Sequence, residues 1–183
     1  MTTMKRVYAV SLLKVTSGHV ASANRASSVM QEVLLATIPG VLVLTFYFGP
    51  GTLVNIIFGG TIAVACEYSV TKCRGRNPAA AISDLSILVT STLLCIALPP
   101  YAPWWLILIG VLTAVLLGKH VFGGLGHNPF NPAMVGYAML LISFPVQMSA
   151  WASPRGVAEV PGLVSALRHL FAPGTIDAVT AAT

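Results

Sequence analysis

The stretch GGLGHNPFNPAMVGYAMLLISFPVQMSAW, residues 123–151, combines a glycine-rich loop, two Asn-Pro steps and an apolar segment. Pro129 and Pro132 bias the residues before them towards extended backbone, and Pro132 suits the first turn of a helix that Asn131 would cap. The carboxamides of Asn128 and Asn131 are therefore expected beside an apolar span. This arrangement suits a flat polar ligand, but a tight turn between two membrane helices has the same features.

Three elements carry a resemblance to a known family: Gly123-Gly124-Leu125-Gly126, Asn128-Pro129-Phe130-Asn131-Pro132-Ala133 and Ser143-Phe144-Pro145-Val146-Gln147. With them, the chain from about residue 25 onwards resembles the D subunits of the bacterial Rnf complex. That complex is a membrane electron-transfer assembly linking ferredoxin and NAD. The B subunits of the related sodium-pumping NADH:quinone oxidoreductase are also similar.

The resemblance implies a function and a setting. The chain would be a flavin-carrying membrane subunit that passes electrons between ferredoxin- and NAD-linked partners, coupled to translocation of Na⁺ or H⁺. The implied partners are iron–sulfur subunits, a second subunit with covalent FMN, and small membrane subunits in a bacterial inner membrane. The sequence carries no nicotinamide-binding fingerprint, so NAD is expected on another subunit.

The composition also indicates a membrane protein. Of the 183 residues, 56% are hydrophobic and 8% are charged, and the mean hydropathy is +0.83. Soluble domains carry about 25% charged residues. The net charge of +5 does not indicate nucleic-acid binding, because the basic residues cluster beside apolar spans. Neither the cysteines nor the histidines have the spacing of metal ligands, so no metal site is predicted.

Apolar stretches predict an all-α membrane protein with about five transmembrane helices. Two of the stretches are short and flanked by proline or glycine. The first of these, about 16 residues, would rise about 24 Å as a helix, whereas the hydrocarbon core is about 30 Å thick. Such a helix would be tilted, wrapped by protein or broken. The five predicted spans are 33–49, 53–70, 84–99, 103–121 and 132–146.

Charge distribution predicts the orientation. Basic residues gather in a cytoplasmic amino-terminal arm, residues 1–31, and in a loop at residues 72–76. The transmembrane domain would be residues 32–146, and residues 147–183 would form a periplasmic segment with an amphipathic helix at 163–171. Because members of the resembled family are about twice as long, the chain is expected to be the first half of a pseudo-repeated bundle.

The last seven residues, DAVTAAT, suggest by themselves only a flexible tail of small residues. The resemblance implies more, since its members carry FMN joined through phosphate to a threonine in an Asp-x-x-Ser/Thr-x-Ala-Thr motif. Asp177, Thr180, Ala182 and Thr183 match that motif, and Thr183 is the implied acceptor. Ala178 departs from it, because relatives commonly have glycine there. Thr183 would be a tether, and no catalytic residue is expected on this chain.

Two carboxylates are candidates for an ion path, because a charge inside a span costs about 3 kcal/mol on insertion scales. Glu67 lies near the end of the second span, and Asp84 begins the third. Asp84 has an alternative role as a plain helix cap. Glu67 is expected to pair with Lys72 or Lys119.

The resemblance further implies a noncovalent riboflavin near the quoted stretch. Asn128 and Asn131 offer carboxamide donors and acceptors that suit the imide edge of a flavin. Lys119 would stabilise a reduced, anionic flavin.

A transporter or channel without redox chemistry is the alternative function. Short spans beside an irregular loop suit such a protein equally well. A bound flavin distinguishes the two, because a plain transporter has no use for one.

Overall fold

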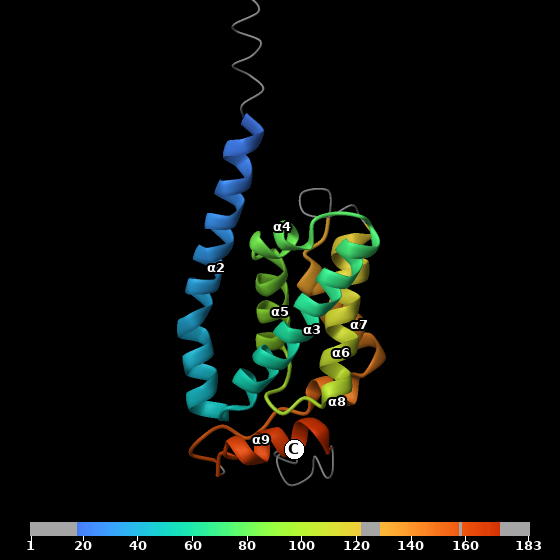
Figure 1. The fold of residues 1–183 in the computed structure, drawn as a ribbon. Coiled ribbons are helices and arrows are strands. Elements are labelled where there is room, and N and C mark those ends of the chain that lie inside the picture. Colours follow the sequence, from blue (N-terminus) through green and yellow to red (C-terminus); the bar gives the residue numbers. More distant parts are fainter. Residues whose placement is uncertain (1–17, 122–128, 158, 173–183) are drawn as a thin grey trace, which may run out of the picture.

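The computed structural model describes residues 18–121, 129–157 and 159–172 (Figure 1). Within these ranges the fold is helical and contains no strand, so the predicted all-α fold is confirmed. Each helix begins near a proline, glycine or small polar residue that breaks an apolar run. The elements are α2 (Gly18–Phe48), α3 (Gly51–Cys73), α4 (Pro78–Ser83), α5 (Ser86–Ala97), α6 (Trp104–Thr113), the π-helix η1 (Ala114–His120), α7 (Pro132–Ser143), α8 (Pro145–Ser149) and α9 (Leu163–Phe171).

Five apolar helical segments occupy the places of the five predicted spans. Two are long enough to cross a membrane alone, Ser27–Phe48 within α2 and Gly51–Cys73 of α3. The others are α5, α6 continued by η1, and α7. The first helix is longer than expected, because α2 begins at Gly18, inside the stretch assigned to the amino-terminal arm. It also continues through Pro39, so this proline does not end the helix.

The third span can be short because other helices surround it, so it does not have to cross the lipid alone. The 12 residues of α5 rise about 18 Å, which is too little to cross a hydrocarbon core alone. Neighbours compensate, since α5 packs against α2, α3, α6 and α7. Ile87, Leu94 and Cys95 of α5 are fully buried among them. Of the three alternatives for this span, wrapping by protein is the one that the structure shows.

Close helix packing holds α6 against α7. A Cβ placed on Gly136 of α7 would lie 2.6 Å from the carbonyl oxygen of Gly110 and 3.0 Å from the Cβ of Ala114. Membrane helices associate largely through such close contacts, since lipid and side chains are equally apolar. Leu140, one turn after Gly136, is fully buried against the same helix.

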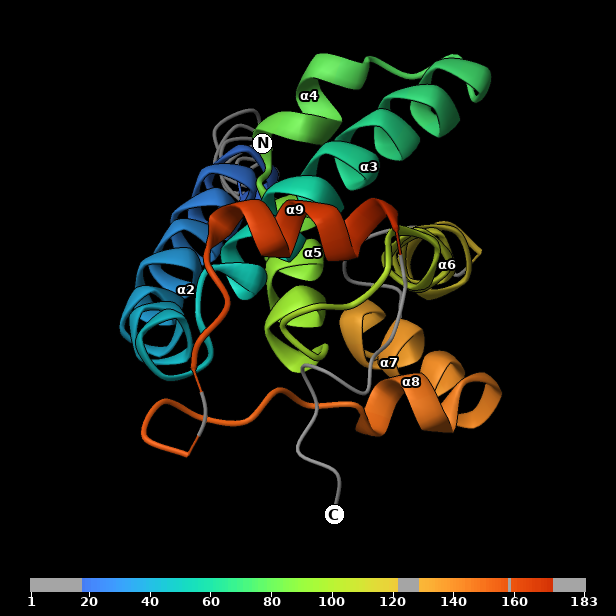
Figure 2. The same cartoon turned by 90° about the horizontal axis from the view of Figure 1, so that it is seen from below.

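The segment after α7 lies across one end of the bundle (Figure 2). Arg155 ties it to the end of α2, and Tyr101 lies between that end and the segment, with its hydroxyl also 3.2 Å from the Pro161 carbonyl oxygen. Arg155 donates its backbone N–H to the Tyr47 carbonyl at 2.7 Å and its Nε–H to the Phe46 carbonyl at 2.8 Å. Tyr101, between α5 and α6, donates to the Phe48 carbonyl at 2.8 Å. The segment is therefore fixed to the bundle by hydrogen bonds as well as by apolar packing.

Helix α9, Leu163–Phe171, has the bounds expected for the amphipathic helix. Ala166 and Leu170, one turn apart, face the bundle and are buried. The ring of His169 meets Tyr101 edge to face at 5.9 Å, and Phe171 meets Phe58 of α3 at 6.0 Å. These contacts fix α9 across the first half of α3, at the end of the bundle where α3 begins.

Replacing Gly136 with alanine should destabilise the contact between α6 and α7. The added methyl group overlaps the backbone of Gly110, and overpacking of this kind costs about 1–3 kcal/mol. We expect Gly136→Ala to lower the Tm of the purified protein. The matched control is Gly40→Ala in α2, where no atom lies within 4 Å of the new Cβ and alanine favours the helix. Equal Tm values for the two variants would contradict this packing.

Tyr101 makes stability depend on pH in the alkaline range. Burial raises the pKa of Tyr101 from 10.0 to about 12. In the unfolded chain the phenol ionises near pH 10, while the folded protein keeps its proton. Stability should therefore fall as pH rises from 10 towards 12. We expect Tyr101→Phe to flatten this part of a plot of Tm against pH. A slope unchanged by the substitution would show that Tyr101 is not responsible.

Candidate functional site

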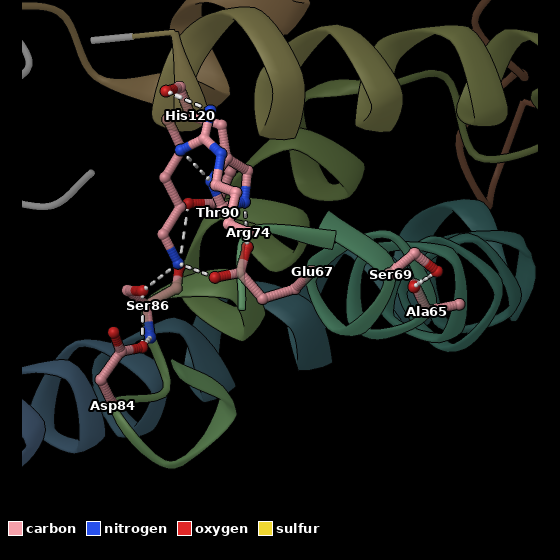
Figure 3. A network of polar contacts seen from close by, with 9 residues as sticks. Ala65, Glu67, Ser69, Arg74, Asp84, Ser86, Thr90 and His120 are labelled. Atoms are coloured by element: carbon pink, nitrogen blue, oxygen red, sulfur yellow. Dashed lines mark hydrogen bonds and ion pairs between the residues drawn. The ribbon is translucent and has the colours of Figure 1, made fainter. Parts of the chain in front are cut away.

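A buried polar network lies at the end of the bundle opposite α9 (Figures 1 and 3). Its centre is Glu67, near the end of α3, whose side chain is 2% exposed. One carboxylate oxygen accepts from Lys119 Nζ at 2.9 Å, and the other lies 2.8 Å from His120 Nε2. Both oxygens of a buried carboxylate thus have partners. The predicted pairing of Glu67 with Lys119, rather than with Lys72, is the one formed.

The π-helix allows consecutive residues to reach one carboxylate. Adjacent side chains of an α-helix point about 100° apart and do not face the same neighbour. Residues 114–120 form wider turns, with an N–H to carbonyl bond from Val121 to Leu116, five residues back. The angle between adjacent side chains becomes smaller, and Lys119 and His120 both face Glu67. Such π-helical turns occur frequently at functional sites.

Arg74, in the loop after α3, closes the network on one side. Its Nη2 donates to the carbonyl of His120 at 3.1 Å, which satisfies an acceptor at the end of the π-helix. Its Nη1 lies 3.5 Å from His120 Nδ1. With Nε2–H donating to Glu67, Nδ1 is the acceptor on the ring, and it faces a guanidinium. Glu67 and Arg74 thus contact the imidazole of His120 from opposite ring nitrogens.

Ser86, at the start of α5, extends the network on the other side. Lys119 Nζ donates to its hydroxyl oxygen at 3.0 Å, and the hydroxyl donates to Asp84 Oδ1 at 2.6 Å. The same oxygen of Asp84 accepts the backbone N–H of Ser86 at 2.9 Å. Asp84 therefore satisfies the first N–H of α5, where a negative charge is also favoured by the helix dipole. Asp84 is the residue before the N-cap, Leu85, so it supports the start of α5 from one position earlier than a capping residue.

The backbone between Asp84 and Ser86 is strained. Leu85 has φ of +60°, the left-handed region that non-glycine residues rarely adopt. A residue held there costs of order 1–3 kcal/mol and persists where its surroundings require it. The hydrogen bonds of Asp84 and Ser86 on either side of Leu85 hold this turn.

The charges of the network balance. The network contains two carboxylates, Glu67 and Asp84, and two basic side chains, Lys119 and Arg74, and its ion pairs join Glu67 to Lys119 and His120. In the described part of the chain every buried side-chain nitrogen and oxygen has a hydrogen-bond partner. A low-dielectric site of this kind strengthens each interaction and makes any unpaired member costly.

The structure describes only some of the residues that were predicted to bind flavins. Asn131 is exposed and caps α7, because its side-chain oxygen accepts from the Ala133 N–H at 3.0 Å. Gly118 lets η1 touch the start of this helix, since a Cβ there would lie 2.8 Å from Pro132 Cα. Lys119 is occupied by Glu67 and Ser86. The other residues of the two proposed flavin sites lie outside the described residues, namely Asn128, Asp177, Thr180 and Thr183.

Sequence reasoning missed three members of the network, His120, Arg74 and Ser86. One signal was available for His120. The predicted topology places the end of the second span and the end of the fourth on the same side of the membrane. Glu67 and the Lys119-His120 pair both stand at those ends. The π-helical turn that lets both residues bind has no comparable signature in the sequence.

Comparison with known proteins decides the family. Residues 14–183 match the NQR2, RnfD, RnfE family. The chain belongs to this family. Its curated relatives are named as D subunits of ion-translocating oxidoreductase complexes. The protein from Ectopseudomonas mendocina is 51% identical over 154 residues, which are 84% of this chain and 45% of the relative.

Other relatives agree with this match. The D subunit from Cellvibrio japonicus is 44% identical over 95% of this chain and 50% of its own length. That from Pseudomonas aeruginosa is 47% identical over 83% of this chain and 44% of its own length. The chain spans about half the length of the curated relatives it matches. Membership of the family supports a place in the membrane, in agreement with the apolar helices.

Removing one member of the Glu67–Lys119 pair should strongly destabilise the bundle. Loss of one partner leaves the other charge buried and unpaired, which costs about 3–5 kcal/mol. We expect Glu67→Gln and Lys119→Met each to lower the Tm of the purified protein markedly. Lys72→Met is the matched control, because Lys72 lies on the exposed surface of the same helix as Glu67.

The double variant Glu67→Gln/Lys119→Met tests the coupling. It removes both charges, so its loss in Tm should be clearly smaller than the sum of the two single losses. Additive losses would show that the ion pair does not contribute as a unit.

Proposed function

We propose that the chain belongs to a flavin-carrying membrane subunit of an ion-translocating electron-transport complex of the Rnf type. The complex would move electrons between ferredoxin- and NAD-linked subunits and couple them to translocation of Na⁺ or H⁺. Its other members would be iron–sulfur subunits, a second subunit with covalent FMN and small membrane subunits. The setting would be a bacterial inner membrane, with residues 147–183 on the periplasmic side.

The observation that carries this proposal is membership of the family together with a buried ionisable network inside a membrane bundle. Relatives are named as subunits of ion-translocating oxidoreductase complexes. Ionisable groups at membrane depth are rare and commonly mark ion or proton pathways. The Glu67 network is such a group, and it joins three separate helical elements.

The network offers a route for a cation. Asp84, Ser86, Lys119 and Glu67 form a continuous chain of hydrogen bonds. For Glu67 to take up H⁺ or Na⁺, it must release Lys119 or His120. When Lys119 is released from Glu67, its hydrogen bond to the Ser86 hydroxyl can remain. We therefore assign Glu67 the central place in an ion path and Asp84 its outer end.

Two flavins are proposed. Riboflavin would be bound near the end of η1 and the start of α7, with the carboxamides of Asn128 and Asn131 as its main hydrogen-bonding groups. The side-chain oxygen of Asn131 is used by its own helix, so its amide N–H groups are the donors that remain for a ligand. Glu67 balances the charge of Lys119, so Lys119 would support a reduced flavin only when that pair opens.

FMN would be attached through its phosphate to the hydroxyl of Thr183, with Asp177 and Thr180 as further residues of the attachment motif. The flavin supplies redox chemistry, and the protein supplies its position. The chain leading to this motif follows α9, which Arg155 and Tyr101 help to hold on the end of the bundle. The tether would therefore start from a fixed point.

Thr183→Ala should abolish covalent flavin in protein purified from its native membrane. The acceptor hydroxyl is lost, so the FMN mass should disappear from the carboxyl-terminal peptide and the fluorescent band from a denaturing gel. Thr180→Ser is the control, because the motif takes either serine or threonine at that position and the acceptor stays in place. It should retain the FMN mass on Thr183.

An unmodified Thr183 in the wild-type protein, from a cell with an active flavin transferase, would contradict the tether. The function would then be better described as a transporter or channel without redox chemistry.

A further inference from the structure

A hollow on the outer surface of α3 has no part in the network described above. It is a groove of about 840 Å³ that follows one face of α3 from Ile56 to Ser69. Ile82 of α4 and Leu88 of α5 form its remaining walls. The groove opens to the outside of the bundle, and almost all of its lining is apolar. Figure 1 shows the three helices, with α4 at the end of the bundle opposite α9.

Small side chains create the hollow. Gly60, Thr61, Ala65 and Ser69 lie along one face of α3 at helical spacing, between larger residues such as Tyr68. The groove is about 20 Å long, since about 13 residues separate its ends at about 1.5 Å each. One leaflet of the hydrocarbon core is about 15 Å thick. The groove is therefore somewhat longer than the hydrocarbon part of one leaflet, and its volume lies within the roughly 300–1,000 Å³ of ligand sites.

Positive charge stands at one mouth of the groove. Lys72 follows Tyr68 by one helical turn, and its ammonium lies 5.7 Å from the centre of the Tyr68 ring. Arg76, in the loop just beyond α3, is exposed as well. Among the described residues no carboxylate pairs with either cation, since the ion pairs there are those of Glu67 with Lys119 and His120. These two charges are available to a partner outside the chain.

We propose that this groove binds a phospholipid with an anionic headgroup, such as phosphatidylglycerol. Its acyl chains would lie against the small residues of α3, and its headgroup phosphate would meet Lys72 and Arg76. Basic residues beside grooves between membrane helices are a recurring way to select anionic lipids. If an apolar helix of another protein filled the groove instead, Lys72 and Arg76 would have no anionic partner. The two positive charges therefore favour an anionic lipid. This inference does not depend on either flavin.

Native mass spectrometry of the complex purified from its membrane tests the proposal. The delipidated complex is incubated with phosphatidylglycerol or with phosphatidylethanolamine of the same acyl chains. The anionic lipid should bind more tightly at one site. Lys72→Gln and Arg76→Gln should each lower the affinity for phosphatidylglycerol about fivefold and leave phosphatidylethanolamine unchanged.

A second pair of variants tests the groove itself. Ala65→Leu fills the groove at mid-length and should weaken binding of both lipids. Ala138→Leu is the matched control, because Ala138 is an exposed alanine on α7 away from the groove. It should bind both lipids as the wild type does.

Three results would overturn the proposal. The first is equal binding of the two lipids by the wild-type complex. The second is equal binding by the Ala65→Leu and Ala138→Leu variants. The third is the absence of any bound lipid in a complex where a cysteine at position 65 cross-links to another subunit, since protein would then cover the groove.

Discussion

The structure depends on holding one carboxylate, that of Glu67, inside a bundle of apolar helices. An isolated charge at this depth is costly, so its position requires partners from other elements. Lys119 and His120 supply them from a π-helical turn, and Ser86 ties Lys119 to the start of α5. The requirement explains why α3, α5 and η1 meet at one end, and why the backbone is irregular there at both Leu85 and the π-helix.

The two ends of the bundle are held by different interactions. At the network end, charges and hydrogen bonds between side chains join the helices. At the other end, Arg155 and Tyr101 donate to backbone carbonyls at the end of α2, and α9 packs across α3. The first arrangement can change with protonation or with a competing cation. The second is a fixed support.

Much of the fold could be predicted because lipid imposes strong rules. A span must be apolar and helical, and prolines and glycines mark where it stops. These rules located the five apolar helices and α9, and they predicted that Asn131 would cap α7. They failed for α2, which begins at Gly18, because a polar stretch can still continue a helix that leaves the apolar zone. They also left open how a span as short as α5 is accommodated, and the structure shows that other helices surround it.

For the site, the sequence alone determined the family, the candidate Glu67 and the expectation that a lysine would pair with it. Apolar composition and motif spacing are local properties, so they can be recognised without a structure. The packing of the helices in space establishes that Lys119 is the partner, that His120 and Arg74 join it, and that Ser86 links the pair to Asp84. These residues come from segments far apart in the chain. Their meeting depends on helix packing and on a π-helical turn, which residue spacing does not encode.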